Sequence, residues 1–251
     1  MNTSSYVIEN ANLSETWIAA LRKITNTGGM EITPLVVILT NFTETPHIRK
    51  ALDENLTRHQ LPSIQTVSET IFPQSLYEYA NYNKAELYKK YTKNLPRIKS
   101  IDSSNANGTY FERLMMFDEN EPVHQLDIII SSLTEGNVRR RSKLQASVFD
   151  PKRDHTNKAF QGFPCLQHVT FYKSENGGLV LNCFYALQYL YRRAYGNWLG
   201  LVNLGKFVAR ETGLEFVRLN CFIGVEHLDH LKKQEAKELL LTIDQLTQVR
   251  V

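Results

Sequence analysis

A hairpin signal in the second half of the chain constrains the fold more than any other feature. Two strand-like apolar runs, residues 165–173 and 178–190, are joined by the sequence SENGG. Both runs are rich in β-branched and aromatic residues, as strands are. Asn and Gly supply the backbone angles that a short hairpin turn needs. The sequence therefore predicts an antiparallel strand pair here.

Other segments have helical or strand-like patterns, without a regular alternation of strand and helix. Strands are expected at 34–42, 143–150 and 214–224. Helices are expected at 16–24, 47–59, 75–95, 123–133, 197–213 and 226–244. Such a mixture without a βαβ rhythm predicts an α+β fold and not a Rossmann-type one. We expect a single domain over residues 1–251, since no repeat or low-complexity tract divides the chain.

Charge and cysteine usage exclude several classes of protein. The net charge of the 251 residues is +3, so the whole molecule is not an obvious nucleic-acid binder. The N-terminal residues lack a secretory pattern, and the longest apolar stretch is too short to span a bilayer. Cys165, Cys183 and Cys221 have no C-x-x-C spacing, which argues against zinc and against a disulfide framework. We expect a cytoplasmic protein without a membrane segment.

An enzymatic function would depend on Cys165, which follows Pro164 at the start of the first hairpin strand. A free thiol has a pKa of about 8.5, so a nucleophilic thiolate needs nearby positive charge or a helix terminus. The run Arg139, Arg140 and Arg141 is the local source of such charge. The alternative is a buried structural thiol, a common state of cysteine.

Several segments occur in an order that resembles the thymidylate synthase and pyrimidine hydroxymethylase family. They are HQLDIII, the basic cluster, SVFDP, FPCLQHVTFY, GGL, the Asn of GNWLGL, and IGVEHLD. In that family a Q-L helix, paired arginines and a W-N-P turn precede P-C-H, and a hairpin, an F-N helix and a G-D-x-H segment follow. YFERL is similar to the family's Y-G-x-x-W-R turn. The resemblance covers residues 108–235, is weak over 1–107, and implies a three-layer α+β fold with a large bent mixed sheet flanked by helices.

The resemblance also implies roles for single residues. Cys165 falls on the nucleophile that adds to C6 of a pyrimidine, so that C5 takes a one-carbon unit from a folate. Asn197 falls on the asparagine that reads the base, and its amide matches the N3–H and O4 edge of uracil; alternatively it is a helix N-cap. His227 falls on the histidine that holds the sugar, or is an ordinary histidine at a helix start. Glu69 falls on the catalytic glutamate, or is a solvated charge.

At several positions the chain departs from the family. Four of its site residues are replaced here, by Ala186 and Leu187 where an arginine and a serine hold the 5′-phosphate, and by Val225 and Asp229 where an aspartate and a tyrosine flank the histidine. The family's other phosphate-binding arginines come from the partner subunit. Depending on the alignment, Arg140 and Arg141 or Ser142 and Lys143 take their positions.

The sequence thus predicts a homodimeric, thymidylate-synthase-like transferase that uses 5,10-methylenetetrahydrofolate to modify C5 of a uracil-type nucleotide or nucleoside. In that family sheet packs against sheet, and we expect Tyr189 and Tyr191 at this interface. The alternative is a catalytically retired module for nucleotide sensing, partner binding or nucleic-acid binding, in which the arginine run binds phosphates. A hydrolase pair of Cys165 and His168 is disfavoured, because their spacing puts them on opposite sides of a strand.

Overall fold

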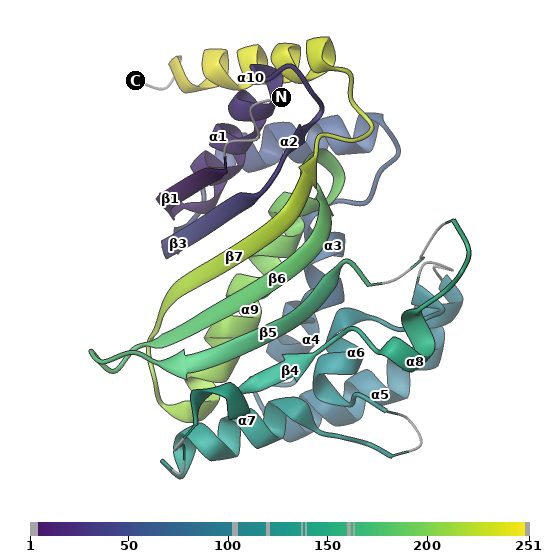
Figure 1. The fold of residues 1–251 in the computed structure, drawn as a ribbon, viewed down its shortest axis with the longest axis vertical. Coiled ribbons are helices and arrows are strands. Elements are labelled where there is room, and N and C mark those ends of the chain that lie inside the picture. The colour runs from purple at the N-terminus through teal and green to yellow at the C-terminus, as the bar shows by residue number, and fades with distance from the viewer. Residues whose placement is uncertain are drawn as a thin grey trace.

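A computed structural model describes residues 5–101, 105–118, 121–136, 138, 140–159, 162 and 164–248. Its centre is a seven-stranded mixed sheet with the order β1-β3-β7-β6-β5-β4, and the short β2 lies beside β7 (Figure 1). The strands are β1 (Tyr6–Asn12), β2 (Glu31–Ile32), β3 (Leu35–Thr43), β4 (Gln145–Ser147), β5 (Leu166–Lys173), β6 (Leu179–Tyr189) and β7 (Phe216–His227). The β1–β3 and β6–β7 pairs are parallel and the other pairs antiparallel. The predicted α+β class is confirmed.

The predicted hairpin is formed by β5 and β6, with Val169 opposite Cys183. Its turn closes where the N–H of Ser174 donates to the carbonyl oxygen of Gly178 at 2.8 Å. A Cβ atom on Gly178 would lie 2.5 Å from both γ-methyl groups of Val217. Glycine at 178 is therefore required by the close approach of β7.

Helices lie behind the sheet in Figure 1: α1 and α9 contact the strands, and α3 packs on α9. The α-helices are α1 (Leu13–Thr25), α2 (Pro46–Arg58), α3 (Ile64–Ile71), α4 (Gln74–Tyr79), α5 (Lys84–Ile101), α6 (Tyr110–Met115), α7 (Gln125–Thr134), α8 (Pro151–Asp154), α9 (Tyr195–Thr212) and α10 (Lys233–Gln248). A 3-10 turn, η2 (Arg141–Lys143), and a π-helical turn, η3 (Leu190–Ala194), complete them. Trp17 of α1 and Trp198 of α9 are fully buried, so the core lies between these helices and the sheet. No helix in the described ranges is long and apolar enough to cross a membrane.

α9 approaches α3 at two glycines that lie one turn apart. A Cβ atom on Gly196 would lie 2.8 Å from the carbonyl oxygen of Ile64, and one on Gly200 would lie 2.7 Å from that of Ser68. No side chain separates the two helix backbones at these points, which only glycine permits. This contact fixes the distance between the two helices, each of which carries a predicted site residue.

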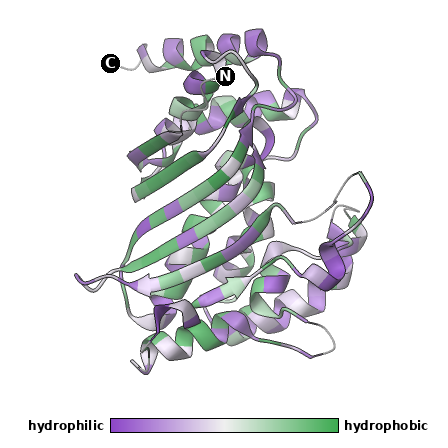
Figure 2. Ribbon diagram, viewed as in Figure 1, coloured by the Kyte–Doolittle hydropathy of each residue, from purple (hydrophilic) through white to green (hydrophobic). Residues whose placement is uncertain are grey.

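The face of the sheet turned toward the viewer in Figure 1 carries no helix among the described residues. On this open face Phe184 stacks on Phe222 with ring centroids 5.7 Å apart, and His168 stacks on Phe184 at 6.0 Å. In the neighbouring row the Asn220 amide donates to the Asn182 side-chain oxygen at 2.8 Å. Figure 2 shows apolar and polar residues alternating along these strands. The cross-strand ladders stabilise the sheet and leave a partly apolar surface, with Phe222 43% exposed.

Two predicted helices differ from the structure. The predicted helix 75–95 is two helices, α4 and α5, because the chain turns at Asn81 and Tyr82, which have φ angles of 52° and 57°. Asn83 then accepts a hydrogen bond from the N–H of Glu86 at 3.0 Å where α5 begins. The C-terminal helix begins at Lys233 and not at 226, because residues 226–227 extend β7 and pair with β2.

Candidate active site

Cys165 lies immediately before β5 and is half-buried. Its carbonyl oxygen accepts the N–H of Ala186 in β6 at 3.2 Å. The hydroxyl of Tyr110 hydrogen-bonds with the backbone of Cys165 and Leu166. Tyr110 is the first residue of α6, which a capping box fixes at its N-terminus. The YFERL and FPC segments, far apart in the sequence, therefore meet at the predicted nucleophile.

A positive charge reaches this thiol from the π-helical turn η3, between β6 and α9. The charge of Arg193 acts on both the Cys165 sulfur and the Tyr110 hydroxyl. Burial raises the pKa of Cys165, and the Arg193 charge lowers it in part. Within the described ranges, no hydrogen bond or ion pair engages the Arg193 guanidinium. π-helical turns are rare and are frequently found at functional sites.

The arginine run that was expected to supply this charge lies elsewhere. The Arg141 guanidinium lies 5.8 Å from the centroid of the Tyr172 ring. Tyr172 is near the far end of β5, about 23 Å along the strand from Cys165 at a rise of about 3.3 Å per residue. Arg140 precedes η2 and is exposed, whereas Arg139 lies outside the described residues. For Arg140 and Arg141 the prediction that they supply charge to the thiol of the same chain is therefore wrong.

Asn197 is the third residue of α9 and is only 5% exposed. Its interpretation as an N-cap is wrong, because α9 continues directly from η3 and the backbone of Ala194 is already helical. Its side chain makes no hydrogen bond with any residue that the structure describes. Arg193 and Asn197 are four residues apart in continuous helical backbone, so they lie on the same side of it. A buried amide of this kind has its donor and acceptor available to a ligand.

Glu69 lies on the side of α3 that faces α5. One carboxylate oxygen accepts three hydrogen bonds, from the Gln65 amide at 2.7 Å and from the hydroxyl and backbone N–H of Ser75 at 2.8 and 3.1 Å. Glu69 also lines a pocket of about 610 Å³ between α3, α4 and α5. The pocket extends to Thr109, the residue that precedes Tyr110. Glu69 is therefore held by its neighbours at the edge of a cavity that borders α6.

His227 ends β7 and does not start a helix. Its Nδ1 accepts the N–H of Asp229 at 2.9 Å, and its ring meets that of Tyr189 edge-on at 6.3 Å. From the register of β5, β6 and β7 it lies about 14 Å from Cys165, at about 3.3 Å per residue and about 4.8 Å per strand. His227 and Cys165 therefore act on one ligand only if that ligand lies between them.

Two other residues that were singled out from the sequence, Asp229 and Tyr191, have structural roles. Asp229 is 5% exposed and forms an ion pair with Arg192. It also accepts the backbone N–H of Tyr191 at 3.3 Å, so it anchors η3. Tyr191 was expected at a subunit interface, but it is 1% exposed and its hydroxyl donates to Asn55 at 2.6 Å. That expectation is wrong, because Tyr191 belongs to the core of its own chain.

A buried ion pair joins the segments that lead to the site. Arg113 of α6 is 1% exposed and donates to both carboxylate oxygens of Asp154 at 2.5 and 2.8 Å. It also donates to the carbonyl oxygens of Val148 at 2.8 Å and Asn107 at 3.0 Å. One side chain thus ties α6 to α8 and to the loops that precede each of them.

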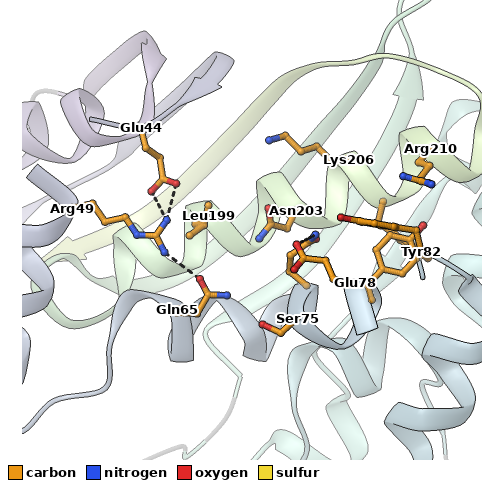
Figure 3. A pocket seen from close by; sticks show the side chains of 13 residues that line it. Glu44, Arg49, Gln65, Ser75, Glu78, Tyr82, Leu199, Asn203, Lys206 and Arg210 are labelled. Carbon is orange, nitrogen blue, oxygen red and sulfur yellow. Dashed lines mark hydrogen bonds and ion pairs between the residues drawn. The ribbon is translucent and has the colours of Figure 1, made fainter. Parts of the chain in front are cut away.

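A second pocket, of about 580 Å³, lies between α9 and the α3–α4 segment (Figure 3). At one end Arg49 donates to both carboxylate oxygens of Glu44 and to the side-chain oxygen of Gln65. Asn203 of α9 lines this pocket. It is six residues from Asn197, a rotation of about 240° around the helix, so the two amides point to different sides of α9. Asn197 therefore does not line this pocket.

Arg193 was not predicted from the sequence. The signal was present, because Arg193 precedes Asn197 by the four residues that place side chains on one side of a helix. It was overlooked because Tyr189 and Tyr191, just before it, were expected at a subunit interface. In the described ranges no group of three or more His, Cys, Asp and Glu side chains could hold a metal ion.

Fold and site together define an α+β protein with a half-buried thiol beside a tyrosine hydroxyl and an arginine charge. No known protein family matches the chain, and no curated protein matches it.

Proposed function

We propose that the chain is a thymidylate-synthase-like transferase that attaches a one-carbon unit to C5 of a uracil-type nucleotide or nucleoside. One observation carries the proposal. The Cys165 thiol, the Tyr110 hydroxyl and the Arg193 charge lie together, beside a helix that presents the buried, unpartnered amide of Asn197. The mixed sheet with helices packed on one face supports an enzyme of the α+β class.

The side chains fit the steps of this chemistry. The Cys165 sulfur, after losing its proton, forms a bond with C6 of the ring while the C5=C6 electron pair moves toward C5 and O4. C5 thereby becomes nucleophilic. The Asn197 amide donates to O4, where charge develops, and accepts the N3–H of the ring. Loss of the C5 proton would let the donor amine leave the transferred carbon, and the thiolate would leave C6 when water adds to that carbon and the C5=C6 bond re-forms. His227 holds the sugar.

In this proposal 5,10-methylenetetrahydrofolate supplies the one-carbon unit, and the pocket around Glu69 suits such a group. Its volume of about 610 Å³ lies in the usual range of ligand sites. Its walls combine aromatic and aliphatic side chains, Tyr79, Tyr91 and Ile98, with the charged Arg97 and Glu69. Flat rings can pack on the apolar wall, and Arg97 can bind a carboxylate of the glutamyl tail.

We also propose that the chain forms a homodimer through the open face of the sheet. The Phe184–Phe222 stack makes this face partly apolar, as an interface requires. Ala186 and Leu187 offer no charge to a 5′-phosphate. Arg140 and Arg141, remote from Cys165 of their own chain, hold the phosphate at the partner's site. Three free cysteines fit the proposed cytoplasmic location.

The test is covalent trapping. Fluorodeoxyuridylate or its nucleoside is incubated with the protein and methylene-tetrahydrofolate, and intact mass followed by peptide mapping detects an adduct on Cys165. Cys165→Ser should abolish the adduct. Cys221→Ser, which changes a fully buried thiol, should leave it unchanged. An unaltered mass with both saturating ligands would contradict the proposal.

The second candidate function is a retired module of the same fold. This second function is favoured by burial of the Cys165 thiol and by the absence of charge at Ala186 and Leu187. In that case Arg140 and Arg141 bind phosphates of a nucleic acid. Salt-dependent retention on a nucleic acid, lost when both arginines are neutralised, would identify this class. Full biological activity of Cys165→Ser would point the same way.

A further inference from the structure

We propose that the pocket between α9 and the α3–α4 segment binds a sugar phosphate. Lys206 and Arg210 hold the phosphate, and Glu78 accepts a sugar hydroxyl (Figure 3). The volume of this pocket, about 580 Å³, is large enough for such a ligand. None of the residues proposed to act in one-carbon transfer lines the pocket, so this site does not depend on the proposed function.

One side of α9 supplies hydrogen-bond donors to the pocket, from Asn203, Lys206 and Arg210. These residues follow one another at intervals of three and four positions, which places their side chains on one side of the helix (Figure 3). In the described part of the chain, none of the three side chains has a hydrogen bond or an ion pair with another residue. Their donors are therefore available to a ligand.

The distribution of charge makes one end of the pocket suitable for an anion. Glu44 and Arg49 occupy the other end, and Arg49 donates to both carboxylate oxygens of Glu44 at 3.0 and 2.8 Å (Figure 3). These two charges neutralise each other. Lys206 and Arg210 have no such partner among the described residues. Two cations four residues apart on a helix can contact the same phosphate group, which both residue types commonly bind.

Tyr82 holds the Arg210 guanidinium in the pocket. The guanidinium lies over the Tyr82 ring, 4.5 Å from its centroid, and the Tyr77 ring meets that of Tyr82 edge-on at 5.3 Å. Tyr82 has a φ angle of 57°, an outlier for so large a side chain, and such residues are concentrated at ligand sites. Stacking uses the flat face of the guanidinium. Its N–H groups, which lie in the plane, can therefore donate to two phosphate oxygens.

The wall opposite α9 is polar and suits a ligand with hydroxyl groups. Gln74, Ser75 and Glu78 line it. The Gln74 amide donates to one carboxylate oxygen of Glu78 at 2.8 Å, and no other described residue donates to this carboxylate. The second oxygen can therefore accept from a ligand, and acidic side chains are common acceptors for ribose hydroxyls. A phosphate on α9 with hydroxyls toward Glu78 describes a sugar phosphate, free or within a nucleotide.

Isothermal titration calorimetry with ribose 5-phosphate tests this site. We expect saturable binding of one molecule per chain. Lys206→Gln and Arg210→Gln should each weaken binding about tenfold or more, because each removes a charge-assisted hydrogen bond. Arg210→Lys keeps the charge but loses the planar donor group, so its affinity should lie between those of Arg210→Gln and the wild-type protein. Glu78→Ala should weaken the binding of ribose 5-phosphate but not that of inorganic phosphate.

Lys237→Gln, which changes an exposed lysine of α10, is the matched control and should bind like the wild-type protein. Cys165→Ser should also bind ribose 5-phosphate normally, whether or not the wild-type protein forms the fluorodeoxyuridylate adduct. Uridine 5′-monophosphate distinguishes the two sources of the ligand. Affinity equal to that of ribose 5-phosphate supports a free sugar phosphate, and tighter binding that still depends on Arg210 supports a nucleotide. The proposal is overturned if neither compound binds, or if Lys206→Gln and Arg210→Gln both bind as tightly as the wild-type protein.

Discussion

Replacing Arg113 by methionine tests the buried ion pair behind the site. The change keeps most of the side-chain volume but removes hydrogen bonds to Val148, Asn107 and both carboxylate oxygens of Asp154. Asp154 is 7% exposed, so its carboxylate is left buried without its cation. Breaking a buried pair in this way costs about 3–5 kcal/mol. For a chain of this size each kcal/mol lowers Tm by about 2–4 °C, so we expect a fall of about 6–20 °C.

Urea unfolding and thermal melts measure this loss, with a double variant and a surface control. Arg113→Met with Asp154→Leu removes both charges and should recover more than half of the loss. Arg218→Met breaks the exposed pair with Glu9 and should cost less than about 1 kcal/mol. Two results would contradict this role of the ion pair. One is a loss of unfolding free energy in Arg113→Met no larger than in Arg218→Met, and the other is a double variant no more stable than Arg113→Met alone.

Two further predictions concern the sheet. Burial, and then the charge of Asp229, raise the pKa of Glu226 well above its usual range. The wild-type protein therefore loses stability as the pH rises from the ordinary carboxyl pKa to this raised value, and Glu226→Gln does not. The Tm of Glu226→Gln minus that of the wild-type protein should increase between pH 5 and 9. A Tm difference that does not change with pH would contradict this prediction. Replacing both Phe184 and Phe222 by Asp should give a monomer in sedimentation. The control Leu241→Asp, which changes an exposed residue of α10, should leave the dimer intact. A monomeric wild-type protein would rule out the interface.

Local patterns predicted most elements but not their junctions. The hairpin, β3, β4, β7 and the end of α9 at Gly213 follow from turn chemistry and apolar periodicity, which act over a few residues. The strands β1 and β2 were not predicted. The break at Asn81 and Tyr82 was missed because the apolar pattern continues across it. η3 was missed because a π-helical turn has no sequence signature of its own, and the anchoring carboxylate, Asp229, comes from the loop after β7.

The candidate site was predicted in part. The structure brings Tyr110 to Cys165, a contact that the sequence did not predict, whereas the roles of Cys165, Glu69, Asn197 and His227 stay predictions. The arginine run was misplaced because nearness in sequence says nothing about which end of a strand a loop reaches. Arg141 precedes β4, and the antiparallel pairing of β4 with β5 carries it to the end of β5 away from Cys165.

The position of β7 in the sheet has a consequence for biosynthesis. This strand is the last to leave the ribosome, yet it lies between β3 and β6 and joins the two halves of the sheet. Until it emerges, the β1–β3 pair and the β4–β5–β6 meander each present an unpaired edge to other nascent chains. The sheet is completed only when β7 has emerged, and a product truncated before residue 216 would be prone to aggregate.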